Sequence, residues 1–144
     1  MYKHILLPTD GSTLSTKALR QGLALAKQVG ARATAVIVRR PLREFVAEGV
    51  TIAVPESAQQ DYIREMDKLL DTARREALDA GVTCDALQVL GEDPWEKIIE
   101  TANERKCDLI VMASHGYRGL TALLLGSETQ KVLAHATVPV LVVR

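Results

Sequence analysis

Three short polar segments hold most of the residues in this sequence that could do chemistry. They are Asp10-Gly11-Ser12, Ser114-His115-Gly116 and Gly126-Ser127. Glycine lets a backbone approach a phosphate without an intervening Cβ, and the free N–H groups at the start of a helix attract anions. The three segments therefore suit an anion or nucleotide site. The alternatives are an ordinary N-cap for Gly126-Ser127 and a turn or N-cap acid for Asp10.

The same segments give little support to catalysis. Ser114 and His115 are neighbours on one predicted loop, which does not make a nucleophile and base pair, and no orienting acid is evident. Cys84 and Cys107 are isolated and are expected to be buried thiols. The sequence has no G-x-x-x-x-G-K-[ST] motif, and no G-x-G-x-x-G follows the first apolar run. These absences exclude a P-loop enzyme and disfavour a dinucleotide fold.

The polar segments must be positioned by the elements around them. Apolar runs predict five strands, and apolar residues at helical spacing predict a helix after each of the first four. The strands are expected over residues 4–9, 33–38, 82–90, 109–113 and 138–143, and the helices over residues 14–29, 57–80, 94–102 and 127–136. Thr13 or Ser15 is expected to cap the first helix. This alternation predicts one α/β domain with a doubly wound, five-stranded parallel sheet and helices on both faces.

Residues 40–55 do not follow either periodicity and are expected to form a long connection. Arg39, Arg40 and Arg43 form a basic cluster at its start. We favour a solvated loop over a ligand-binding role for these arginines.

The composition narrows the classes of protein. The chain has 144 residues, of which 47 % are hydrophobic and 25 % charged, with a net charge of zero. This balance fits a globular domain and disfavours a nucleic-acid binder, which usually carries a basic surplus. No apolar run reaches the roughly 20 residues needed to cross a bilayer, and the start is too short for a signal peptide. We therefore expect a cytoplasmic protein.

Parallel sheets bind ligands beyond the carboxyl ends of their strands, where the strand order reverses. The segments after the first and fourth strands would flank one crevice if these strands are neighbours. The sequence resembles the universal stress protein family over its whole length, 1–144. The resemblance is carried by residues 5–12, 108–116 and 124–127, which lead into 138–143.

The nucleotide-binding branch of that family carries the pattern G-x2-G-x9-G-[ST]. This chain matches it at Gly116, Gly126 and Ser127, whereas Ala113 replaces the first glycine. The substitution adds a methyl group where the family's backbone runs close to the nucleotide. The resemblance implies the strand order 3-2-1-4-5 and a stress-response regulator that binds ATP, with any Mg²⁺ held mainly through phosphates and water.

The resemblance also implies roles for individual residues. Asp10 would face the ribose or a metal-bridged phosphate, and Val38 and Met112 would touch adenine, although both could be plain core. Pro8 and Thr9 would line the floor of the site, and Ala113 and Gly116 would offer their backbone to the sugar and phosphates. The phosphate tail would be held by Gly126, Ser127, Glu128 and Thr129. Two alternatives stay open: an interaction module with a degenerate pocket, and an enzyme such as a slow ATPase.

The last predicted strand, Val138–Val143, is apolar on both faces yet should lie at an edge of the sheet. An apolar edge with unpaired N–H and C=O groups is usually protected, and here only Pro139 and Arg144 offer protection. We therefore expect a homodimer in which this strand pairs with its symmetry mate. The alternative is that the long second helix or residues 40–55 cover the edge.

Overall fold

A computed structural model describes residues 1–116 and 124–144. Its main sheet has five parallel strands in the order β5-β2-β1-β6-β7. The strands are β1 (His4–Pro8), β2 (Arg32–Arg39), β5 (Cys84–Leu90), β6 (Leu109–Ala113) and β7 (Val140–Val143). Counted in chain order within this sheet alone, the arrangement is the predicted 3-2-1-4-5. The labels differ because two further strands, β3 and β4, lie outside the sheet.

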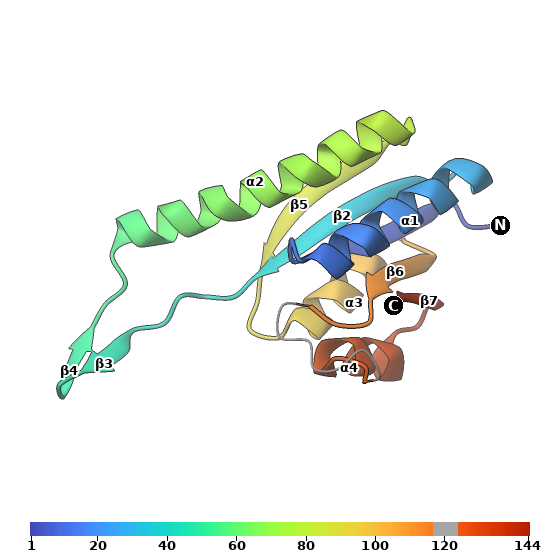
Figure 1. The fold of residues 1–144 in the computed structure, drawn as a ribbon. Helices are drawn as coiled ribbons and strands as arrows, with labels where there is room; N and C mark the ends of the chain where they lie inside the picture. The colour runs from blue at the N-terminus through green and yellow to red at the C-terminus, as the bar shows by residue number, and fades with distance from the viewer. Residues whose placement is uncertain (117–123) are drawn as a thin grey trace.

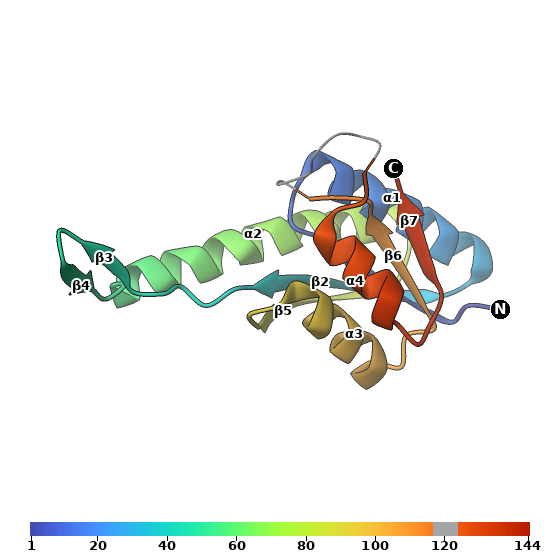
Figure 2. The same ribbon diagram turned by 90° about the horizontal axis from the view of Figure 1, so that it is seen from below.

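Helices cover both faces of the sheet, as predicted (Figure 1, Figure 2). The four helices of the described residues are α1 (Thr13–Val29), α2 (Glu56–Ala80), α3 (Pro94–Glu104) and α4 (Ser127–His135). Helices α1 and α2 pack on one face, and α3 and α4 pack on the other.

The sheet separates two hydrophobic clusters because successive side chains of a strand point to opposite faces. Leu7, Val111 and Ala113 belong to the cluster under α1 and α2. Leu6 and Met112 belong to the cluster under α3 and α4. A strand buried on both faces is typical of a parallel sheet, and the central strands β1 and β6 are buried along their whole length.

The start of α1 corrects one local prediction. Ser12, and not Thr13 or Ser15, is the N-cap, and its side chain accepts a hydrogen bond from the Ser15 backbone N–H at 3.2 Å. Helix α1 ends at Gly30, whose φ of +71° is the left-handed conformation that glycine adopts without strain. Strand boundaries also shift, since β5 begins at Cys84 and β7 begins at Val140.

The segment predicted as an irregular connection contains a β-hairpin. Strands β3 (Phe45–Ala47) and β4 (Val50–Ile52) pair antiparallel around a turn at Glu48 and Gly49, which have φ of +51° and +76°. Positive φ at both central residues is the signature of a type I′ hairpin turn. The hairpin extends away from the sheet, beyond the start of α2 (Figure 1, Figure 2).

The cysteines are free, as predicted, with Cys107 buried and Cys84 half-buried. Burial raises the pKa of Cys107 to about 11 and also raises the pKa of Cys84, so both are thiols near neutral pH. None of the helices in the described ranges has the length and apolar character that crossing a membrane requires.

Candidate functional site

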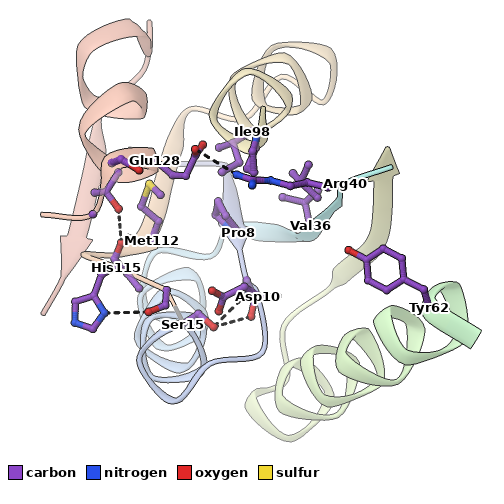
Figure 3. Close-up of a pocket in the computed structure, with 18 residues that line it drawn as sticks. Pro8, Asp10, Ser15, Val36, Arg40, Tyr62, Ile98, Met112, His115 and Glu128 are labelled. Atoms are coloured by element: carbon purple, nitrogen blue, oxygen red, sulfur yellow. Dashed lines mark hydrogen bonds and ion pairs between the residues drawn. The ribbon is translucent and has the colours of Figure 1, made fainter. Parts of the chain in front are cut away.

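A cavity of about 430 Å³ opens at the edge of the sheet where β1 and β6 end (Figure 3). The two strands are neighbours, so the loops that follow them meet at one place, as the topology predicts. All of the residues predicted for the site line this cavity: Pro8, Thr9, Asp10, Val38, Met112, Ala113, Gly116, Gly126, Ser127, Glu128 and Thr129. Residues 117–123, within the G-x9-G spacing, lie outside the described residues.

Hydrogen bonds fix the loop after β1. The Thr9 backbone N–H donates to the Val36 carbonyl at 2.9 Å, which continues the β1–β2 pairing past the end of β1. The Thr9 and Ser15 hydroxyls lie 3.1 Å apart, and the Ser12 backbone N–H donates to Asp10 Oδ1 at 2.9 Å. The Asp10 side chain is therefore held by its own turn at the mouth of the cavity.

Gly116 lies directly against this carboxylate. A Cβ added to Gly116 would overlap Asp10 Oδ2. Only glycine lets the chain after β6 approach Asp10 this closely without moving one of the two. The second glycine of the motif is thus required by the geometry of the cavity wall.

Gly126 joins the end of β6 to the start of α4. Its backbone N–H donates to the Ser114 carbonyl at 2.7 Å, and a Cβ at Gly126 would come within 3.2 Å of the same carbonyl oxygen. No side chain among the described residues caps α4 at this end. The first backbone N–H groups of α4 therefore stand at the cavity wall, where a helix start favours an anion.

The side chains of Glu128 and Thr129 hold the cavity together. The buried Thr129 hydroxyl donates to the Ala113 carbonyl at 2.9 Å. Glu128 accepts a hydrogen bond from the Trp95 backbone N–H at 2.8 Å and lies 3.7 Å from Arg40. These contacts tie α4 to β6 and α3. Because both side chains are engaged in them, Glu128 and Thr129 would contact a phosphate through their backbone N–H groups.

Ala113, the departure from the family pattern, is nearly fully buried. Its side chain belongs to the hydrophobic cluster under α1 and α2, together with Leu7 and Val111. The neighbouring Met112 faces α3 and α4, on the other side of the sheet. The extra methyl group of Ala113 is therefore packed in the core.

The apolar part of the cavity wall comes from the cluster under α3 and α4. Val36, Val38, Ile98 and Met112 all belong to this cluster and all line the cavity. Val38 and Met112 are therefore core residues that also line the cavity, and their contact with a ligand stays a prediction.

Several lining residues were missed by the sequence analysis: Ser15, Val36, Arg40, Tyr62, Pro94, Ile98 and His115. Arg40 is exposed and follows the end of β2, as the interpretation of a solvated loop predicts, but it also lines the cavity, where its guanidinium lies beside Glu128 (Figure 3). Its position two residues after Val38, at the carboxyl end of a strand, was the available signal. Tyr62 reaches the cavity from α2, and nothing in the sequence indicated this.

The polar groups that line the cavity are suited to binding a ligand. His115 Nδ1 lies 3.2 Å from the carbonyl oxygen of Gly116, and the only hydrogen bond recorded for its ring among the described residues is this one. The described residues contain no cluster of three or more histidine, cysteine, aspartate or glutamate side chains that could hold a metal ion. The cavity offers a carboxylate, a guanidinium and a helix start around an apolar wall.

Known proteins resemble this chain over its whole length. The model of the universal stress protein family matches residues 1–144. The universal stress protein YxiE of Bacillus subtilis is 34 % identical over 149 residues, which cover 100 % of both chains.

Two solved structures share the fold. A universal stress protein in complex with cAMP is 24 % identical, has a TM-score of 0.74, and covers 99 % of this chain and 97 % of its own. The universal stress protein from Archaeoglobus fulgidus in complex with dAMP is 19 % identical, has a TM-score of 0.64, and covers 99 % and 98 %. Together with the match to the family model along the entire sequence, these similarities establish that the chain belongs to the universal stress protein family.

Proposed function

We propose that this protein binds an adenine nucleotide, ATP, in the cavity at the carboxyl ends of β1 and β6, and that its role in the stress response is regulatory. The observation that carries the proposal is the packing of Gly116 against Asp10, where an added Cβ would overlap the carboxylate at the polar end of the cavity. This cradle lies in one cavity with the start of α4 at Gly126 and Ser127.

The two ends of the cavity match the two ends of a nucleotide. Val38, Ile98 and Met112 give an apolar wall for the base. Gly126 and Ser127 give backbone N–H groups at a helix start, and Ser127 adds a hydroxyl for the phosphates. The volume of about 430 Å³ lies within the range of small-molecule sites. That two proteins of the same fold hold cAMP and dAMP supports an adenosine ligand for this fold.

Mg²⁺ would depend on the nucleotide. Asp10 can contribute one carboxylate oxygen, and the remaining ligands would be phosphate oxygens and water, which Mg²⁺ accepts readily. We therefore expect the ion to bind with ATP.

The competing function, an interaction module with a degenerate pocket, rests on Ala113. The placement of its methyl group in the core cluster under α1 and α2 favours nucleotide binding over this alternative. Mass spectrometry of the purified, denatured protein distinguishes the two functions. Co-purified ATP, ADP or AMP supports binding. Protein that carries no nucleotide and acquires none after incubation with millimolar ATP supports the degenerate pocket.

We also propose a homodimer through β7. This strand is at one edge of the sheet and pairs with β6 on its inner side. Leu141 at its centre is 44 % exposed. A two-fold axis would pair this edge with the same edge of a second copy, which satisfies its N–H and C=O groups and covers Leu141.

A further inference from the structure

The hairpin formed by β3 and β4, residues 45–52, which we call the arm, has one apolar face. Directly paired residues of an antiparallel hairpin lie on the same face, and the face alternates along each strand. The pairs Phe45↔Ile52 and Ala47↔Val50 therefore share one face, and the pair Val46↔Thr51 lies on the other. Phe45, Val50 and Ile52 are 53 %, 61 % and 38 % exposed.

The arm has little support from the other helices and strands of the described residues. Strands β3 and β4 make their main contacts with each other, and both views show the arm away from the sheet (Figure 1, Figure 2). An isolated two-stranded hairpin is marginally stable in water unless its apolar face packs against something. The arm is thus built to pack against a surface outside this part of its own chain.

The N-terminal half of α2 offers such a surface. The fully buried residues of this helix, Leu70, Ala73 and Ala77, all lie in its second half. The start of the helix extends past the end of the sheet (Figure 1), and the helix meets β5 where Gln88 Nε2 donates to the Ile63 carbonyl at 2.9 Å. Tyr62, Ile63 and Met66 on this half are only partly buried, and their spacing places them on one side of the helix. We call these three residues the α2 stripe.

The arm and the α2 stripe are kept apart within one chain. Only residues 53–55 separate β4 from α2, and they hold the arm beyond the first turn of the helix (Figure 1). The stripe begins six residues into α2 and ends ten residues in, which is about 9 to 15 Å along the axis. The apolar face of the arm and the α2 stripe therefore lie at different places in one chain.

We propose that the arm packs on the α2 stripe of a second copy of this chain, so that two copies exchange arms. The apolar face of this eight-residue hairpin measures roughly 10 Å by 10 Å, far below the roughly 800 Å² per partner of a stable interface. Two-fold symmetry uses the contact twice and brings the exposed halves of both α2 helices together. A second copy therefore suits this surface better than an unrelated partner, which would gain the contact once.

This exchange would act beside the nucleotide cavity. Tyr62 belongs to the α2 stripe and also lines the cavity, so the arm of a second copy would cover that side of the cavity. The contact is separate from β7, because β5 and β7 are the opposite edges of the sheet and α2 packs on β5.

Sedimentation equilibrium of the full chain carrying Leu141→Lys, which disables the β7 edge, tests the exchange. We expect a concentration-dependent mass that rises from 15.7 kDa toward twice that value. Phe45→Ser with Ile52→Ser should raise the dissociation constant about tenfold or more, as truncation of central apolar contacts does. The control Val46→Ser, on the other face of the arm, should leave it unchanged. Circular dichroism checks that each variant folds. A monomer at all concentrations, or equal effects of both sets of substitutions, overturns the proposal.

Disulfide trapping locates the contact. Val50→Cys and Met66→Cys proteins, mixed and oxidised, should form a cross-linked pair that neither protein forms alone. Cross-links between two Val50→Cys chains without the mixed pair would show arms packed on each other and contradict the exchange.

Discussion

At the scale of single residues, Asp10 and Gly116 form the polar end of the cavity. The Asp10 carboxylate is oriented by the Ser12 backbone N–H, and Gly116 leaves no room for a Cβ beside it. A ligand that reaches this end meets a fixed carboxylate and bare backbone, whereas the opposite wall is apolar. If the proposed function holds, these residues would orient a nucleotide with its base toward Met112.

Ala113→Gly tests whether the departure from the family pattern affects binding. The Ala113 methyl group packs in the core cluster under α1 and α2, so we expect unchanged affinity for ATP by calorimetry. The free energy of unfolding should fall by about 0.5 to 1 kcal/mol, because glycine in a strand costs backbone entropy and packing. A clear gain in affinity would show instead that the methyl group crowds the nucleotide.

The lining of the cavity was predictable for the residues that the family resemblance assigns, but not for those that reach it from α2 and α3. Asp10, Gly116, Gly126 and Ser127 stand out because they follow predicted strands and because three of them match the glycine pattern of the family, although each residue type is also common in turns and helix caps. Tyr62 and Ile98 look like ordinary residues of amphipathic helices, and their place in the cavity depends on how α2 and α3 pack on the sheet. Sequence periodicity gives the buried face of a helix but not its neighbours in space.

At the scale of elements, α4 is held to the end of β6 by one buried hydroxyl. Thr129 donates to the Ala113 carbonyl at 2.9 Å. Thr129→Val keeps the shape and leaves this carbonyl without its donor, so we expect a loss of about 1 to 3 kcal/mol in the free energy of unfolding, measured with urea. The control is Thr137→Val, whose hydroxyl is exposed and 3.4 Å from Asn103. Equal small effects of both substitutions would show that the Thr129 bond does not support α4.

The elements that carry strong periodicity were predicted well, and the hairpin was missed for a physical reason. The turn at Glu48 and Gly49 lacks the Asn-Gly or Asp-Gly pair that marks most type I′ turns, and Glu48 at φ of +51° is an uncommon choice. Strands of three residues are also too short to show alternation. Phe45 and Ile52 are apolar, but the hairpin does not pack in the hydrophobic core. Its residues therefore do not show the sequence pattern of a buried strand.

At the scale of the whole molecule, the buried His4 couples folding to pH. Its ring lies 2.7 Å from the Thr34 hydroxyl and 2.9 Å from the Arg105 carbonyl. Burial and then the positive charge of Arg32 lower the pKa of His4 below 6.5, against the opposing effects of the Arg105 carbonyl, Asp108 and Asp85. At pH values near and below 6.5, the unfolded chain therefore binds more protons than the folded protein. The free energy of unfolding should fall as the pH drops below about 6.5.

Urea denaturation between pH 7.5 and 5 measures this effect. The wild-type protein should lose more stability on acidification than His4→Gln, which has a polar side chain that does not titrate. Parallel curves for the two proteins would show that His4 is not the group responsible.

Leu141→Lys tests the dimer through β7. A lysine at the centre of this exposed edge strand opposes a second lysine across a two-fold axis, so the weight-average mass at micromolar concentration should fall in sedimentation experiments. Leu78→Lys is the control, because this exposed leucine lies on α2, which packs on β5 at the opposite edge of the sheet. A mass that Leu141→Lys leaves unchanged would rule out β7 as the interface.

Isothermal titration calorimetry of ATP with Mg²⁺ into the wild-type protein and Gly116→Ala tests nucleotide binding most directly. We predict saturable heat for the wild-type protein and a loss of at least about tenfold in affinity for Gly116→Ala, because the new methyl group must displace the Asp10 carboxylate or the backbone beside it. Gly30→Ala is the control, because Gly30 caps the end of α1 away from the cavity and has no atom within 4 Å of an added Cβ; its φ of +71° makes alanine cost some stability, but the variant should bind like the wild-type protein. A folded wild-type protein that gives no heat at millimolar ATP, or equal binding by wild type and Gly116→Ala, would contradict nucleotide binding in this cavity.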